Sequence, residues 1–231
     1  MSRITRPPVA DDLDYPTSDG RPMAETDWHR KLMTTLIETL TAFFAASPRV
    51  CVSGNLLVFY EPGNRRRRVA PDVFVVRGVP KHDRPNYLIW RERKAPEFVI
   101  ELTSSTTRRE DVAHKFALYR DVMRVKEYFL FDPFEEHLRP PLQGYRRVGS
   151  RFRPVKAAGG RLPSRVLGLH LEARGELVRL SHPAKGRLLP IPPEVREAQK
   201  RADAARRKAE AEVRRLRREV EELRRSPPGR P

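Results

Sequence analysis

Two acidic residues in apolar runs, and one lysine that follows them, are the side chains of this sequence best suited to chemistry. Asp72 stands at the start of the run Pro71-Asp72-Val73-Phe74-Val75-Val76, and Glu101 lies inside Phe98-Val99-Ile100-Glu101-Leu102. Runs rich in Val, Ile and Phe predict buried strands. An ionised carboxylate is costly in such a strand unless a cation or hydrogen-bond donors meet it. Two of them indicate a shared cation, and a divalent metal ion bound by oxygen ligands is the natural candidate.

The lysine lies on a predicted helix that follows the Glu101 strand. The apolar face of this helix, counted on a helical wheel from Val112, comprises Phe116, Tyr119, Val122 and Met123. Lys115 falls inside that face, Arg108 shares the stripe, and Asp111 lies at its edge, where it could orient Lys115. Lys115 either passes the core to reach solvent or points into a polar cleft. Because the helix starts beside the Glu101 strand, we expect the cleft, where two carboxylates and an amine would suit metal-assisted cleavage of a phosphodiester.

Composition limits the class of protein. The chain has 231 residues, of which 39% are apolar and 33% charged, which fits one domain with an extension. The net charge of +17 and the pI near 10.8 favour a polyanionic partner, most naturally nucleic acid, although an arginine-biased composition would give the same numbers. Cys51 is the only cysteine, which excludes an intrachain disulfide and a cysteine-built zinc site. Without a signal-like apolar segment or a membrane-length run, we expect a cytoplasmic protein.

The order of predicted elements indicates an α/β protein with a mixed (α+β) sheet. We expect a helix over residues 25–46, strands over 50–60, 71–76 and 97–102, a second helix over 108–125, and a fourth strand over 127–133. Gly54 is the position at which the first strand could kink, and the first two strands are predicted to form a hairpin. The strand–helix–strand order after residue 97 favours a parallel pair with a right-handed crossover.

Smaller elements and a long helix follow this core. A short hairpin is predicted over 144–148 and 152–155, and another strand pair over 167–171 and 177–180. The predicted division is a polar N-terminal arm (1–23), a globular domain (24–182), a Pro-rich linker (183–193) and a charged helix (194–231).

The charged helix has a narrow apolar seam. It comprises Val195, Ala198, Ala202, Ala205, Ala209, Val213, Leu216, Val220 and Leu223. The spacing alternates between three and four residues with one break, which is typical of a coiled coil with a stutter; a single solvated helix would also fit. Residues 194–231 hold 13 basic and 8 acidic side chains, so most of the +17 belongs to the preceding domain.

Two further groups of residues are candidates for accessory roles. Glu25 and His29 stand four residues apart on the first helix and could supply an outer ligand or a proton acceptor, or simply cap the helix and face solvent. The basic run comprises Arg65, Arg66, Arg67 and Arg68. At the tip of a hairpin it could contact phosphates and position nucleic acid without reading its sequence, or act as a solubilising turn.

The chain as a whole resembles the Uma-type "putative restriction endonuclease" family of the PD-(D/E)XK nuclease superfamily. The matching segments are residues 17–23, 25–29 and 53–56, the runs Ala70-Pro71-Asp72-Val73 and Ile100-Glu101-Leu102-Thr103-Ser104, residues 109–111, Lys115, Tyr119, and residues 127–133. Together they extend over residues 15 to 180, and family members often add a charged helical tail.

This resemblance implies a restriction endonuclease-like core, with the order helix, three strands, helix, strand, and a DNA endonuclease activity. It implies that Asp72 and Glu101, with the backbone carbonyl of Leu102, hold Mg²⁺ or Mn²⁺. The commonest form of the motif has a lysine two residues after the acid, where this chain has Thr103. Relatives offer a helix lysine instead, which corresponds to Lys115. The alternatives are a nuclease fold that binds nucleic acid without cleaving it and an interaction protein that dimerises through the domain or the C-terminal helix.

Overall fold

The computed structural model describes residues 14–17, 26–103, 109–184 and 186–225; the side chains of residues 109–112 and 223–225 are not among the described parts. The chain divides into two compact units, residues 1–189 and residues 190–231. The first unit is a mixed α/β fold, and the second contains the long helix α4 (Pro192–Arg225). The helix α4 carries the seam predicted from the sequence.

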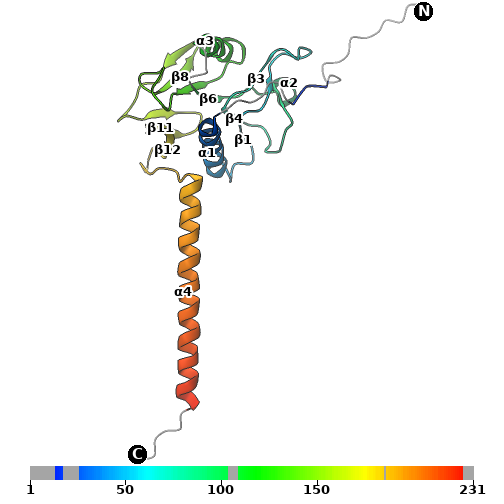
Figure 1. The fold of residues 1–231 in the computed structure, drawn as a ribbon. Coiled ribbons are helices and arrows are strands. Elements are labelled where there is room, and N and C mark those ends of the chain that lie inside the picture. Colours follow the sequence, from blue (N-terminus) through cyan, green and yellow to red (C-terminus); the bar gives the residue numbers. More distant parts are fainter. Residues whose placement is uncertain (1–13, 18–25, 104–108, 185, 226–231) are drawn as a thin grey trace, which may run out of the picture. The chain divides into compact units, whose positions relative to one another are not determined.

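A six-stranded mixed sheet forms the centre of the first unit (Figure 1). Its order is β1 (Val50–Ser53), β4 (Val73–Arg77), β6 (Phe98–Leu102), β7 (Glu127–Phe131), β8 (Leu142–Val148) and β9 (Arg151–Pro154). The pair β6–β7 is parallel and the other neighbours are antiparallel. The parallel pair and the β8–β9 hairpin confirm the corresponding sequence predictions.

Two three-stranded sheets and several helices complete the unit. One small sheet has the order β3 (Arg68–Val69), β2 (Val58–Phe59), β5 (Tyr87–Leu88), and the other has β10 (Leu162–Ser164), β11 (Leu169–Arg174), β12 (Leu177–Ser181). The helices are α1 (Asp27–Phe43), the short α2 (Ile89–Glu92), and α3 (Arg109–Ala117), which continues into a π-helical turn, η2 (Leu118–Val122). The pair β11–β12 confirms a predicted strand pair, whereas β10 had no separate signal in the sequence.

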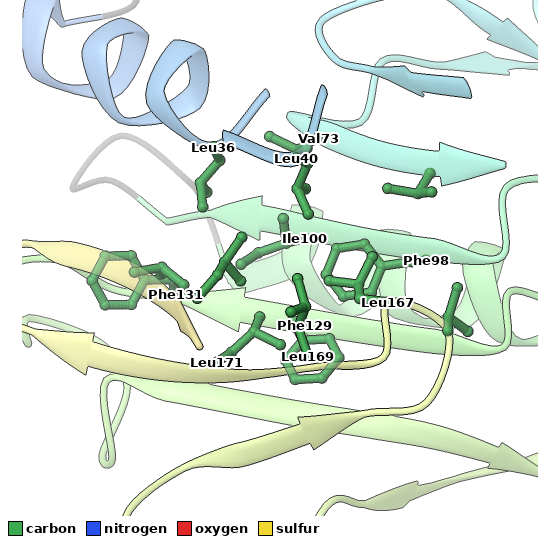
Figure 2. Packing of buried hydrophobic residues seen from close by; sticks show 14 of the residues in the cluster. Leu36, Leu40, Val73, Phe98, Ile100, Phe129, Phe131, Leu167, Leu169 and Leu171 are labelled. Atoms are coloured by element: carbon green, nitrogen blue, oxygen red, sulfur yellow. The ribbon is translucent and has the colours of Figure 1, made fainter. Parts of the chain in front are cut away.

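Strand alternation gives the central sheet two covered faces. Successive side chains of a strand point to opposite faces, so each strand contributes to two hydrophobic clusters. One face packs against α1 and the β10–β12 sheet, and Figure 2 shows Leu36 and Leu40 of α1 beside Val73 and Ile100 of the sheet. The other face packs against η2, where Leu118 and Tyr119 are buried. The second face is the one that carries the candidate site.

The prediction of one strand over residues 50–60 is wrong. The strand β1 ends at Ser53, and the chain then enters the small sheet as β2, so that β1 pairs with β4 while β2 pairs with β3 and β5. The break falls at Gly54 and Asn55, and Asn55 has a φ of 50°, in the left-handed region that interrupts a regular strand. The predicted kink at Gly54 is therefore a change of sheet, and the arginine run lies in the β2–β3 connection, outside the β1–β4 pair.

The predicted apolar face of the second helix is only partly correct. Tyr119 and Met123 are buried and Phe116 is partly buried, but Val122 is 56% exposed. The reason is the π-helical turn η2, because an extra residue in a turn rotates the following positions away from a wheel drawn at α-helical spacing. Leu118, which the wheel left off the face, is buried instead.

A buried carboxylate fixes the β10–β11 connection to the central sheet. The Glu127 side chain at the start of β7 is 1% exposed, and its oxygens accept hydrogen bonds from the Arg146 guanidinium, the Ser164 hydroxyl and the backbone N–H groups of Arg165 and Val166. A buried charge is tolerated when several donors satisfy it. Glu127 therefore holds two sheets together by polar contacts.

Replacing Glu127 should destabilise the fold without touching the candidate site. We expect Glu127→Ala to lower the free energy of unfolding by about 3–5 kcal/mol, because it leaves the partly buried Arg146 guanidinium and buried N–H donors without their acceptor. Urea denaturation followed by circular dichroism measures this loss. Glu136→Ala, at an exposed position, is the control and should change stability by less than about 0.5 kcal/mol. Equal stability of the two variants would contradict the role of Glu127.

Part of the expected N-terminal arm packs against the domain. Tyr15 is buried against Phe59 and Trp90, and its hydroxyl accepts a hydrogen bond from the Gly63 N–H at 2.8 Å.

Within the described parts of the chain, no helix has both the length and the apolar character that crossing a membrane requires.

Candidate active site

The antiparallel pair β4–β6 places Asp72 and Glu101 at one end of the central sheet. Val73 pairs with Ile100, so Asp72, at the bend that directly precedes β4, and Glu101 of β6 follow at the same end of the pair. Alternation directs the Glu101 side chain to the face that η2 covers, opposite to Ile100, and Asp72 is close enough for its charge to raise the pKa of Glu101. The structure thus brings together the two carboxylates that the sequence singled out.

The Asp72 carboxylate is held by groups on both sides of it. Its Oδ2 accepts a hydrogen bond from the Leu102 backbone N–H at 2.7 Å, and its Oδ1 lies 3.3 Å from Nε2 of His29. The side chains of Asp72 and His29 are each 14% exposed. Leu102 was predicted to offer its carbonyl to a metal ion, and the structure shows that its N–H fixes the neighbouring aspartate.

The His29 side chain reaches Asp72 from the first turn of α1. The Thr26 hydroxyl accepts a hydrogen bond from the His29 N–H at 3.2 Å and caps the helix, which sets where α1 begins. Of the two accessory residues predicted on this helix, His29 lies at the site, whereas Glu25 lies outside the described residues. Arg108 and the side chain of Asp111 also lie outside them.

Gly54 sets the position of Asp72 from the neighbouring strand. A Cβ on Gly54 would lie 2.0 Å from the Asp72 carbonyl oxygen and 2.7 Å from Cδ1 of Ile37. The next residue, Asn55, donates its backbone N–H to the Pro71 carbonyl at 2.8 Å. The absence of a side chain at Gly54 therefore lets two backbone segments meet directly beside the carboxylate. The sequence marked Gly54 only as a kink, because close backbone approach leaves no local pattern.

The Glu101 carboxylate is buried and has a donor on each oxygen. Nζ of Lys115 lies 2.9 Å from Oε2, and the Tyr119 hydroxyl donates to Oε1 at 2.5 Å. The Glu101 side chain is 6% exposed and that of Lys115 is 22% exposed. The predicted approach of Lys115 to the carboxylates is thus seen as a direct ion pair.

Burial and neighbouring charges set the protonation of Glu101. Burial is the largest influence and raises the pKa of Glu101 to about 7, while the Lys115 amine lowers it, the Asp72 carboxylate raises it and the Tyr119 hydroxyl lowers it. Burial and the charge of Glu101 raise the pKa of Tyr119 well above its usual value, so the phenol remains a donor. The Lys115 amine and the Asp72 carboxylate therefore act in opposite directions on the protonation of Glu101.

The turn η2 is what presents Tyr119 to Glu101. Tyr119 is fully buried and also packs against Tyr128, with ring centroids 5.1 Å apart. Lys115 and Tyr119 are four residues apart, so one face of the helix delivers both donors to one carboxylate. Sequence reasoning placed Tyr119 on an apolar face and assigned it no polar partner. Its spacing from Lys115 was the available signal.

Thr103, at the position where the family resemblance leads one to expect a lysine, is buried and hydrogen-bonded. Thr103 is 4% exposed, and both its N–H and its hydroxyl donate to the Phe131 carbonyl, at 2.8 and 3.2 Å. The threonine is therefore tied to β7 and contributes no charge, whereas Lys115 brings an ammonium group to the site from the helix.

The oxygen donors of this site fit a hard divalent cation. Among the described residues, no three side chains of His, Cys, Asp or Glu converge as a metal-binding group. Mg²⁺ does not require such a group, since one or two carboxylates, water and substrate phosphate commonly complete its octahedron. With two carboxylates and one lysine, the site carries one uncompensated negative charge when both acids are ionised. The donor set is thus compatible with Mg²⁺ or Mn²⁺.

The arginine run lies between β2 and β3 and extends into the first residue of β3. Arg65, Arg66 and Arg67 are exposed in the β2–β3 connection, while Arg68 is half-buried and donates to the Arg65 carbonyl at 2.8 Å. Arg67 lies 3.5 Å from the Glu61 carboxylate. Three guanidinium groups therefore face solvent, one of them beside an acid.

Comparison with models of known protein families shows the family to which this chain belongs. The profile of the Uma2 family, described as "Putative restriction endonuclease", matches residues 5–201. The chain belongs to this family. The match extends over the whole described first unit and into α4, which agrees with the resemblance inferred from the sequence.

The Uma2 assignment is accompanied by a structural likeness. A crystal structure described as "a putative nuclease belonging to DUF820 from Anabaena variabilis" is 16% identical and matches with a TM-score of 0.49, covering 72% of this chain and 95% of the other. A comparison with curated proteins gave no match.

Adding a methyl group at Gly54 should displace Asp72. We expect Gly54→Ala to lower the free energy of unfolding by about 1–3 kcal/mol and to shift the amide resonance of Leu102, because the new Cβ overlaps the Asp72 carbonyl. Chemical denaturation and amide NMR spectra measure the two effects. Gly149→Ala is the comparison: a Cβ there meets nothing within 4 Å, and only its φ of 59° opposes alanine. An unchanged Leu102 resonance in Gly54→Ala would contradict this account.

Proposed function

We propose that this Uma2 protein is a Mg²⁺-dependent endonuclease that hydrolyses phosphodiester bonds of DNA. The observation that carries the proposal is the convergence of the Asp72 and Glu101 carboxylates with the Lys115 ammonium group at one end of the central sheet. The family description supports nuclease chemistry, and the net charge of +17 supports a polyanionic substrate. The fold is proposed to be the restriction endonuclease-like core.

The two carboxylates are proposed to hold the metal ion together with the Leu102 backbone carbonyl. When bound, Mg²⁺ or Mn²⁺ would polarise a phosphate oxygen and lower the pKa of a bound water. Asp72 is already oriented for this by the Leu102 N–H, which leaves its Oδ1 on the side of His29. Tyr119 fixes the rotation of the Glu101 carboxylate by binding Oε1.

Lys115 is proposed to orient the attacking water and to offset negative charge as the phosphorus becomes five-coordinate. A fixed ammonium group placed where charge develops stabilises a transition state more than the ground state. Lys115 has the access for this role, because its side chain is partly exposed while Glu101 is not. It takes the part that the motif lysine plays elsewhere, since Thr103 occupies that position.

A binding protein without catalysis is the second candidate, and Thr103 is the observation that favours it. If an ion pair with Glu101 were the only role of Lys115, the site would lack the free cation that cleavage requires. Nucleic acid would then bind to the basic surface without being cut. The experiment below separates these two functions.

Removing either carboxylate charge should abolish cleavage. We expect Asp72→Asn and Glu101→Gln to reduce Mg²⁺-dependent nicking of plasmid DNA by at least about a hundredfold, because each removes one anionic metal ligand. The assay compares Mg²⁺ with EDTA and includes circular dichroism to confirm folding. Asp83→Asn and Glu136→Gln, at exposed positions, are the controls and should cut at the original rate. Wild-type protein that binds DNA but does not cut it would favour the second candidate.

The arginine run should contribute to DNA affinity without sequence preference. We expect the triple variant R65A/R66A/R67A to bind duplex DNA more weakly and to reduce the slope of log affinity against log salt by about 2–3, since each phosphate contact releases counterions. Binding is measured by fluorescence anisotropy in EDTA, which suppresses cleavage. R214A/R215A/R218A on α4 removes the same charge and serves as the control. Equal slopes for the two variants would mean that the run has no specific part in binding.

A further inference from the structure

The helix α4 exposes large apolar side chains along one line. Val213, Leu216 and Val220, which belong to the apolar seam of this helix, are 47%, 46% and 48% exposed. Their spacings of three and four residues place them on one stripe of an α-helix. The surrounding positions are almost all charged, so the stripe is narrow. A narrow apolar stripe on a charged helix is the pattern by which two helices pair.

Heptad positions follow from this spacing. With Val213 and Val220 at position a, Leu216 is at position d, and Ala209 and Ala202 fall at d in the two preceding heptads. β-Branched residues at a with leucine at d favour a two-stranded parallel coiled coil. The same frame places Arg206 at an a position, where its charge would oppose pairing. The strong part of the contact is therefore the C-terminal half of α4.

The charges beside the seam identify the partner and its direction. Glu212 and Glu219 occupy g positions and Arg217 occupies an e position. In a parallel pair, residue g of one helix faces residue e of the next heptad on the other, so Glu212 would meet Arg217 of a second copy and form the same contact twice. In an antiparallel pair g faces g, which would bring Glu212 and Glu219 against each other. We propose that α4 pairs with α4 of a second copy of this chain in a parallel, in-register coiled coil through the seam.

Contacts within α4 leave these groups available for the partner. The Glu212 carboxylate has Nη2 of Arg215 at 2.6 Å in its own helix, and the two side chains are 50% and 70% exposed. An exposed pair of this kind contributes little stability and can rearrange. The net charge of +4 on residues 192–225 would suit a nucleic acid as well, but nucleic acid gives no reason for three aligned apolar residues.

The mass of the full chain in solution tests the pairing. Light scattering during size-exclusion chromatography should give twice the chain mass of 26.8 kDa. Arg217→Glu should weaken the dimer about 3–10-fold, because it places Glu opposite Glu212. The double variant E212R/R217E should restore the dissociation constant to within about threefold, as a reversed but complementary pair. Arg218→Glu makes the same charge change at an f position that faces away and should leave dimerisation unchanged.

Cysteine crosslinking tests the direction. Ala209→Cys and Leu216→Cys, made separately, should each give a disulfide-linked dimer under mild oxidation, whereas the original chain, with only the buried Cys51, should not. The two positions are about 10 Å apart along the helix. In an antiparallel pair, at most one of the two positions can lie next to the same position of the second chain, so only one of the two variants would form a disulfide-linked dimer.

Three outcomes would overturn the proposal. The first is a monomer at concentrations of about 100 µM, well above the range of stable coiled-coil pairs. The second is a dimer that Arg217→Glu and Arg218→Glu weaken equally, which would place the contact outside the seam. The third is a chain that stays monomeric until duplex DNA is added, which would assign α4 to nucleic acid. None of these results depends on cleavage, so the pairing and the proposed endonuclease activity are tested separately.

Discussion

The antiparallel pairing of β4 with β6 is the constraint on which the candidate site depends. Its register places Asp72, which directly precedes β4, and Glu101 of β6 at the same end of the pair. The hydrogen bond from the Leu102 N–H to Asp72 closes this arrangement, since it ties the side chain that precedes β4 to the backbone of β6. A slip of one residue between β4 and β6 would separate the Asp72 and Glu101 carboxylates, because it turns the side chains of one strand to the opposite face. Among the described residues, the side chains of His29, Lys115 and Tyr119 each contact one of these two acids.

The surroundings of Glu101 explain how a buried acid persists in a strand. Burial opposes the charged form, and the Lys115 amine and the Tyr119 hydroxyl each satisfy one oxygen. The surroundings of Glu127 are different. Its carboxylate accepts hydrogen bonds from backbone N–H groups, a hydroxyl and one arginine, and these contacts stabilise the packing of two sheets. The difference between a structural acid and a candidate catalytic acid therefore lies in the partners: Glu101 has a nearby acid and a partly exposed lysine, and Glu127 has only donors.

The helix that supplies both donors to Glu101 changes its geometry between them. Lys115 belongs to α3 and Tyr119 to the π-helical turn η2 that follows. A π-helical turn carries an extra residue and is frequent at functional sites. Here it buries Leu118 and Tyr119 and leaves Val122 exposed. The π-helical turn thus packs against the sheet and at the same time places the Tyr119 hydroxyl at the Glu101 carboxylate.

The sequence by itself determined most strands of the central sheet, the two carboxylates and the lysine, because these depend on local patterns. An acid within an apolar run and a lysine on an apolar helix face are visible without coordinates, and so is the seam of the final helix. Only the tertiary structure decided that β4 pairs with β6, that the segment 50–60 changes sheet at Gly54, and that Tyr119 and His29 reach the acids. These features rest on contacts between residues far apart in the chain, such as the approach of Gly54 to the Asp72 carbonyl. Periodicity describes one element at a time, and it carries no information about the backbone that will lie against it.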